Sequence, residues 1–314
     1  MSRLFTCGII LGFVACSLAW ETSVNLGEPI NTVYNEWFPV FPDDGSYMLF
    51  VSDNPQGMGG MDIWISYSNG DEWGTPENLG PSVNTPYDES APSLAENDTV
   101  LYFLSTDPSG YGQGDVWFCD FNAGIPGAKT NMGPPINTAY YDCCPLMSHS
   151  GDRFYICSDR PGGEGDIDIW ISERTGDEWG QPYNAGSEVN TQGHDSPRWI
   201  SDSDQHIVAL SSGPGGYGAA DLYSLTVSGD TLTARTNLGS VINTSSTELG
   251  PGFLNNSGMI AGTIYYGSGR PGGSGGMDIW CSESTQALEP LSWAGIKASF
   301  TLPATPCEAK AECR

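Results

Sequence analysis

Five carboxylate residues stand at a constant spacing along this chain of 314 residues. They are Glu36, Glu89, Asp142, Asp195 and Glu248, each 53 positions after the one before. Carboxylate oxygens gathered at one place would bind a divalent cation such as calcium. Alternatively, each carboxylate caps backbone N–H groups of its own segment. Because a residue that builds the fold must recur in every copy, the structural interpretation is favoured. A calcium site at the five carboxylates remains the second hypothesis.

A different candidate site lies where the repetition fails, in the fourth copy. His194, Asp195, Arg198 and Trp199 stand there, whereas the first copy has Asn35, Glu36, Pro39 and Val40. An aromatic side chain beside charged groups can bind a saccharide or an acidic peptide. Neutral variation within one copy would give the same departure, so both interpretations stay open.

The elements that must position these residues are copies of one unit. A short phrase recurs as NLGEPINT at 25–32, NLGPSVNT at 78–85, NMGPPINT at 131–138, NAGSEVNT at 184–191 and NLGSVINT at 237–244. After each carboxylate come a hydrophobic run, a Gly-rich loop and an apolar run that begins with Asp, such as DIW at 62–64. Four short strands in about 53 residues is the content of one propeller blade. Five units therefore predict an all-β fold, a five-bladed β-propeller of four-stranded antiparallel blades.

The order of the units also predicts how the ring closes. The first phrase precedes the first carboxylate, and no such phrase follows the fifth unit. The segment from Trp20 to Gly27 is therefore expected to supply the outer strand of the last blade. This pairing would leave no open sheet edge.

The repeated motifs resemble a known family. The phrases SDRPGGEGDIDIW at 158–170, SGRPGGSGGMDIW at 268–280 and GDEWGTPENLG at 70–80 are similar to the WD-like repeat of TolB-like bacterial exported propellers. The resemblance covers residues 20 to 285. It implies a propeller with a binding or scaffold role at the cell envelope. TolB itself resembles a six-bladed propeller with an additional N-terminal domain, so its own partners are not carried over.

The composition argues against several partners. The net charge is −27, from 38 acidic and 11 basic residues. Nucleic acid is not expected as a partner, because phosphate binding needs clustered Lys and Arg. No run after the N-terminal segment approaches the roughly 20 apolar residues that cross a membrane. We expect a monomer whose partner is a protein or a cell-envelope glycan.

The first residues are typical of an export signal. Arg3 precedes an uncharged, mostly apolar stretch that ends in Ser17-Leu18-Ala19, a small-residue cleavage site. Residues 1–19 are thus expected to be a signal peptide, 20–296 the propeller and 297–314 a tail. The alternative is a lipid anchor on Cys16, which is less favoured because the first strand would begin almost at the anchor. The mature protein is expected to be secreted or periplasmic.

Seven cysteines follow residue 19: Cys119, Cys143, Cys144, Cys157, Cys281, Cys307 and Cys313. An oxidising compartment allows disulfides. One bridge is expected between neighbouring strands, from either Cys143 or Cys144 to Cys157, and the register does not decide which. Cys307 and Cys313 can close a loop in the tail. Cys119 and Cys281 are equally consistent with reduced, buried thiols.

Catalysis has little support in the sequence. The chain contains no HExxH or Cys-x-x-Cys motif, and its histidines, His149, His194 and His206, are scattered. Five-bladed propeller glycosidases use two carboxylates in distinct roles, but five equivalent carboxylates give no reason for their pKa values to diverge. A non-enzymatic binding scaffold is the favoured function. A glycoside hydrolase or lyase acting in the central channel is the alternative.

Overall fold

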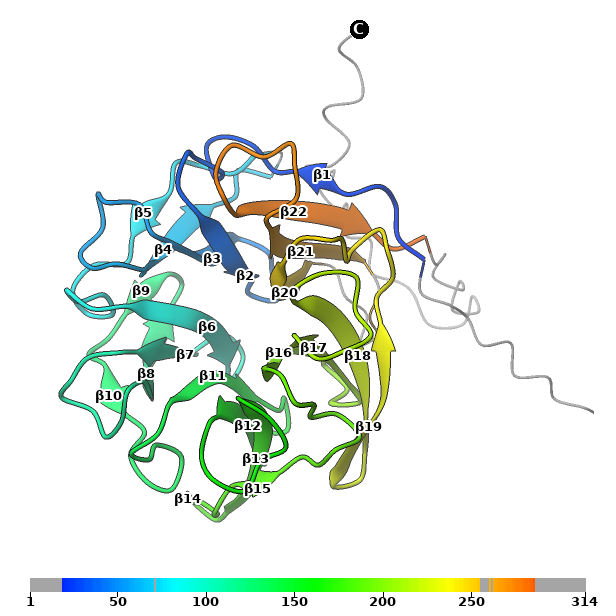
Figure 1. The fold of residues 1–314 in the computed structure, drawn as a ribbon. Coiled ribbons are helices and arrows are strands. Elements are labelled where there is room, and N and C mark those ends of the chain that lie inside the picture. Colours follow the sequence, from blue (N-terminus) through cyan, green and yellow to red (C-terminus); the bar gives the residue numbers. More distant parts are fainter. Residues whose placement is uncertain (1–18, 71, 255–259, 261, 286–314) are drawn as a thin grey trace, which may run out of the picture.

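The computed structural model describes residues 19–70, 72–254, 260 and 262–285, which form five antiparallel sheets around a central axis (Figure 1). Within these ranges every element is a strand and there is no helix. The fold is a five-bladed β-propeller, as the repeat predicts. Among the same residues, no helix has the length and apolar character needed to span a bilayer.

Each blade runs from an inner strand near the axis to a short outer strand (Figure 1). Blades 1 to 5 begin with the inner strands β2 (Glu36–Val40), β6 (Glu89–Ala95), β11 (Asp142–Met147), β16 (Asp195–Ile200) and β20 (Glu248–Leu254). The second strands are β3 (Tyr47–Ser52), β7 (Val100–Ser105), β12 (Arg153–Ser158), β17 (His206–Ser211) and β21 (Thr263–Ser268). The third strands are β4 (Asp62–Tyr67), β8 (Asp115–Asn122), β13 (Asp168–Thr175), β18 (Asp221–Ser228) and β22 (Asp278–Glu283).

The outer strands are short, and one of them closes the ring. Blades 1 to 4 end with β5 (Glu77–Asn78), β10 (Thr130–Asn131), β14 (Glu178–Trp179) with β15 (Tyr183–Asn184), and β19 (Thr231–Asn237); β9 (Ile125–Pro126) pairs with β8. In blade 5 the outer strand is β1 (Val24–Asn25), in which Val24 lies opposite Cys281. Trp20 forms a further bridge with Ser284. The predicted closure by the N-terminal strand is confirmed.

The asparagine of the repeated phrase ties each blade to the one before it. Asn84 is 1% exposed; its side-chain oxygen accepts the Ile63 N–H at 2.9 Å, and its amide donates to the Ile63 carbonyl at 2.9 Å. The amide thus satisfies both backbone groups of one β4 residue, as a neighbouring strand would. The same pair of bonds joins Asn137 to Val116, Asn190 to Ile169, Asn243 to Leu222 and, across the ring closure, Asn31 to Ile279.

The hydrophobic core lies between the blades. One cluster packs Leu49 and Ile63 of blade 1 against Phe103 and Trp117 of blade 2. Trp64, Trp170 and Trp280 occupy the corresponding positions in three further inter-blade clusters. These residues are buried because facing sheets must cover their apolar faces. The aspartates that begin the third strands accept backbone N–H bonds from the preceding Gly-rich loops, as for Met58 N–H to Asp62 at 2.5 Å.

Every inner strand contains a β-bulge, an irregularity that changes the direction of the side chain it carries. The register shifts after Trp37, Ser90, Cys143, Pro197 and Leu249. In four blades the next residue has a positive φ: Phe38 (56°), Ala91 (49°), Cys144 (54°) and Gly250 (44°). Blade 4 has Pro197 there, and since proline fixes φ near −65°, its unpaired residue is Arg198 instead.

The structure decides part of the cysteine prediction. Cys143, not Cys144, lies opposite Cys157, and no disulfide joins these three residues. Cys119 is a free buried thiol, whereas Cys281 is disulfide-bonded. Cys16, most of the expected signal peptide and the tail with Cys307 and Cys313 lie outside the described residues.

Candidate functional site

The five repeated carboxylates lie where the inner strands begin, and all are at most 1% exposed. Each accepts bonds from the backbone N–H and hydroxyl of the threonine four residues earlier. In blade 1 the Thr32 N–H lies 3.0 Å and the Thr32 hydroxyl 2.6 Å from Glu36 oxygens. In four blades the last serine of the second strand also donates, at 3.2 Å from Ser52 to Glu36.

These contacts give the carboxylates a structural role. Arg160 adds an ion pair to Asp142 at 2.6 Å and Arg270 one to Glu248 at 3.5 Å. Burial raises the pKa of Glu36 and of Glu89, although the hydrogen bonds from their serine and threonine partners oppose the shift. Calcium at this ring stays a prediction, which melting in calcium against chelator would test. Within the described ranges, three ligand atoms of His, Cys, Asp or Glu come within 4.8 Å of one another only at Cys143, Cys144 and Cys157.

The four residues expected to form a ligand site separate along β16. His194 and Asp195 lie at its beginning, beside the carboxylate ring. There the Nε2 atom of His194 and one oxygen of Asp195 are buried without a hydrogen-bond partner among the described residues. Arg198 and Trp199 lie near its end, where they line a pocket. Of the four, Arg198 and Trp199 line the pocket, whereas burial, with a smaller contribution from the charge of Arg198, lowers the pKa of His194.

This pocket is a cavity of about 310 Å³ at the end of the channel opposite the carboxylate ring. All five blades line it, through the ends of the inner strands and the turns that follow. The lining residues are Val40–Asp43, Ser93–Asp98, Leu146–His149, Arg198–Ile200, Asp202 and Pro251–Leu254. A concave site is the usual form of a ligand site, and here the exposed lining is mainly polar, with Trp199 among its apolar residues.

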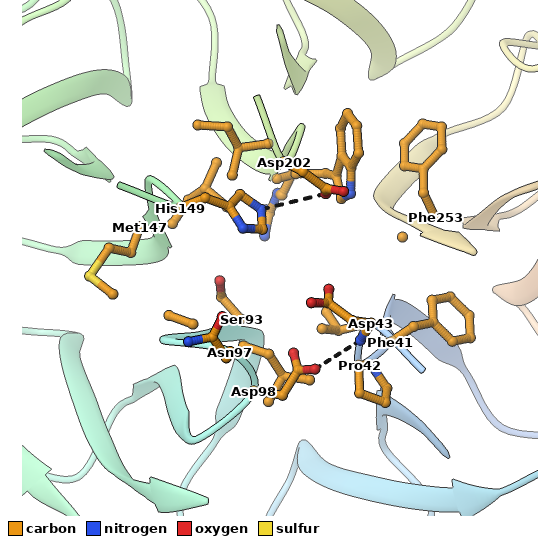
Figure 2. Close-up of a pocket in the computed structure, with 18 of the residues that line it drawn as sticks. Phe41, Pro42, Asp43, Ser93, Asn97, Asp98, Met147, His149, Asp202 and Phe253 are labelled. Atoms are coloured by element: carbon orange, nitrogen blue, oxygen red, sulfur yellow. Dashed lines mark hydrogen bonds and ion pairs between the residues drawn. The ribbon is translucent and has the colours of Figure 1, made fainter. Parts of the chain in front are cut away.

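Acidic side chains and one histidine form the rim (Figure 2). His149 Nε2 lies 3.8 Å from an oxygen of Asp202, and these side chains are 42% and 53% exposed. Asp98 accepts the Asp43 N–H at 2.8 Å, which fastens the turn of blade 2 to that of blade 1. Asp204 does the same between blades 4 and 3, accepting the His149 N–H at 2.7 Å. Burial raises the pKa of Asp98, and the nearby carboxylate of Asp43 adds to the shift.

Arg198 forms the deep end of the pocket. Its guanidinium carbon lies 4.1 Å from the ring centroid of Phe38, which precedes the pocket residues along β2. Its Nε is buried without a hydrogen-bond partner, and no ion pair with another described residue neutralises it. Beside it, the rings of Trp199 and Phe253 pack at 4.3 Å. A lone cation thus faces the cavity next to an aromatic wall.

The blade 2 turn at the rim has an unusual backbone. Glu96, Asn97 and Asp98 have φ values of 53°, 56° and 63°, in the left-handed region that residues with side chains rarely adopt. Three consecutive residues of this kind are held only where surrounding contacts determine them. Here the bond from the Asp43 N–H to Asp98 supplies such a contact.

Sequence reasoning missed the rim residues Asp43, Asp98, His149 and Asp202. They stand in the turns after the inner strands, which read FPDDGS, LAENDT, MSHSGD and ISDSDQ in the first four units. These turns occupy the same position in each unit, but their residues differ. One sequence signal could have pointed to them. Acidic residues and a histidine are concentrated in these turns, whose sequences differ from one unit to the next.

Comparisons with known proteins give the fold and no family. No family model and no curated protein matches the chain. An α-L-arabinofuranosidase from Podospora anserina, solved with cellotriose, aligns with a TM-score of 0.55 and 10% identity over 86% of this chain and 98% of that one. A thermostable family-43 glycoside hydrolase aligns with a TM-score of 0.52 and 12% identity over 88% and 98%.

TolB from Acinetobacter baumannii aligns with a TM-score of 0.49 and 14% identity, over 81% of this chain and 55% of that protein. The chain thus spans about half the length of that TolB, and a likeness at this score carries no argument here. At these identities the two hydrolases show only that the fold is shared. Function has to be argued from the pocket.

Proposed function

We propose that this chain is a non-enzymatic extracytoplasmic binding protein whose ligand, a cell-envelope glycan, occupies the pocket at the end of the inner strands. The observation that carries the proposal is Arg198, a cation without an ionic partner among the described residues, beside the paired rings of Trp199 and Phe253. Because Arg198 lines the pocket, a ligand oxygen can pair with its guanidinium in a charge-assisted hydrogen bond.

The groups around the pocket match the surface of a sugar. The half-buried indole of Trp199 gives an apolar surface on which the C–H face of a sugar packs, and the buried ring of Phe253 supports it. The rim carboxylates Asp43 and Asp202 accept hydrogen bonds from hydroxyl groups. Arg198 donates to a carboxyl or acetamido oxygen at the deep end. The ligand expected here is therefore a saccharide that bears one such oxygen.

The location outside the cytoplasm is part of the same proposal. It is supported by the apolar segment at residues 4–19 and by the likeness of the repeated motifs to TolB-like exported propellers. N-terminal sequencing of the exported protein tests it, with Trp20 expected as the first residue.

Calorimetric titration with soluble envelope-glycan fragments tests the binding site. We expect Trp199→Ala to weaken binding by about tenfold or more, which is about 1.4 kcal/mol. Tyr217→Ala is the matched control, because Tyr217 is an exposed aromatic residue in a loop at the carboxylate-ring end. Equal affinity of wild type and Trp199→Ala, or binding only of an envelope protein at another surface, would refute the pocket.

Glycoside hydrolysis is the second candidate, and one observation favours it. Asp98 has a raised pKa beside Asp43, and a general acid needs a carboxyl group that holds its proton near neutral pH. Release of reducing ends from a polysaccharide panel, lost in Asp98→Asn, would establish this function. No release from any polysaccharide would leave binding as the activity.

A further inference from the structure

Three cysteine side chains that are not among the pocket-lining residues meet in blade 3. The sulfur of Cys143 lies 2.9 Å from that of Cys157 and 3.4 Å from that of Cys144, and all three sulfurs lie within 4.8 Å of one another. The residues are 1%, 0% and 5% exposed in that order. All three are free thiols in this structure.

The cluster is confined to one blade at all three of its positions. Where Cys143 stands, the other blades have Trp37, Ser90, Ser196 and Leu249; where Cys144 stands, Phe38, Ala91, Pro197 and Gly250; where Cys157 stands, Val51, Leu104, Leu210 and Gly267. The other four blades therefore form without a cysteine at any of these positions. Their presence together needs an explanation other than the fold.

The bulge of β11 is what brings the third sulfur in. Consecutive residues of a regular strand point to opposite faces, so Cys143 and Cys144 would normally diverge. Cys144 instead has φ of 54°, and the register shifts directly after Cys143. The bulge turns Cys144 towards the other two sulfurs and towards the channel, where Phe38 and Ala91 are its neighbours.

A cation lies close to the cluster, because the guanidinium of Arg198 stacks on Phe38, which packs against the three cysteines. The thiolate is the form of cysteine that binds metals. Arg198 supplies one positive charge near a group of sulfurs that becomes negative on binding.

We propose that Cys143, Cys144 and Cys157 form a three-thiolate site for a soft metal ion, with monovalent copper as the best fit. Thiolates select monovalent copper, zinc and iron–sulfur centres, and structural zinc almost always takes four ligands. Only three ligand atoms converge among the described residues, and monovalent copper accepts three sulfur ligands in a plane.

The site needs a small adjustment to hold the ion. Three sulfurs at about 2.3 Å from one metal lie about 4.0 Å apart, so the closest pair has to separate by about 1 Å, which rotation of the side chains provides. Binding displaces the remaining thiol protons to solvent, so affinity falls as the pH falls. No electron is transferred in this step.

The first measurement is the thiol state of the exported protein. Alkylation after denaturation without reductant, followed by peptide mass analysis, is expected to find Cys143, Cys144 and Cys157 alkylated, as Cys119 is. A disulfide between any two of the three would overturn the proposal.

The second measurement is metal binding itself. Anaerobic titration with monovalent copper, monitored by thiolate charge-transfer absorption, is expected to saturate at one ion per chain and to raise the melting temperature. The variants Cys143→Ser, Cys144→Ala and Cys157→Leu carry the residues of blade 2 at the same positions, so the blade has a template for folding with them. Each is expected to lose the absorption and the stabilisation, whereas Cys119→Ser keeps both. Retention of one-to-one binding in Cys144→Ala, or no binding by wild type, would refute the site.

Discussion

Arg198 of blade 4 stacks on Phe38 of blade 1, with its guanidinium carbon 4.1 Å from the ring centroid. Blades 1 and 4 are not neighbours, so this contact crosses the central channel. Arg198 lines the pocket, whereas Phe38 stands two residues after the ring carboxylate Glu36. Both residues lie at the bulges of their inner strands.

Gly250 is the residue that makes room for Phe38. A Cβ atom at Gly250 would lie 1.9 Å from Phe38 Cδ1 and 2.8 Å from its Cα, and the φ of 44° is already strained for any other residue. We expect Gly250→Ala to lower the free energy of unfolding by about 2–3 kcal/mol in urea denaturation. Gly80→Ala is the control, since Gly80 has φ of 74° with nothing within 4 Å, and should cost about 1 kcal/mol.

The steric origin of that loss is tested by a double-mutant cycle. Phe38→Ala removes the ring that the new methyl group would meet but not the Phe38 Cα atom at 2.8 Å, so adding Gly250→Ala to it should cost less than in the wild type, though more than the control. An equal cost of Gly250→Ala with and without the Phe38 ring would contradict the close packing between these residues.

Buried Glu36 and Glu89 make stability depend on pH. Burial raises their pKa in the folded state above the ordinary value of 4.5, so the folded protein binds these protons first as the pH falls. Their contribution to the free energy of unfolding is present at and below pH 4.5 and decreases as the pH rises through the folded pKa. Relative to wild type, Glu36→Gln with Glu89→Gln should flatten the urea-derived stability curve above pH 4.5. A wild-type slope in the double variant would show that other groups cause it.

Trp20 joins the closing strand to the pocket wall. It is 7% exposed, bridges Ser284 and lies 6.4 Å from the ring of Phe253, which packs on Trp199. We expect Trp20→Ala to cost about 3 kcal/mol of stability in urea denaturation. Exposed Tyr217→Ala should change stability by less than about 0.5 kcal/mol. A similar small effect of Trp20→Ala would mean that the ring does not depend on this residue.

The blade number and the ring closure could be predicted because they depend on residues that recur. Asn31 and Asn84 perform the same task in every blade, so a constant spacing reveals the unit. The pocket could not be found this way. Asp98 and His149 belong to turns that share a place but no sequence, and only the closed ring brings those turns together.

The strand register within a blade was the other feature that the sequence could not predict. Counting from the turn leaves either Cys143 or Cys144 opposite Cys157. A bulge shifts the pairing of the residues beyond it by one position, and the sequence pattern does not reveal where a bulge occurs. The same effect hid the inward turn of Arg198, which arises because Pro197 cannot adopt the positive φ that Phe38 and Cys144 have.

The affinity of Arg198→Ala for an envelope-glycan fragment that binds the wild type tests the central claim most directly. Arg174→Ala is the matched control, because Arg174 stacks on Trp179 at the outer edge of blade 3. If the ligand satisfies Arg198, Arg198→Ala should raise Kd by about tenfold or more while Arg174→Ala leaves it unchanged. Equal Kd values for wild type and a folded Arg198→Ala variant would contradict the account.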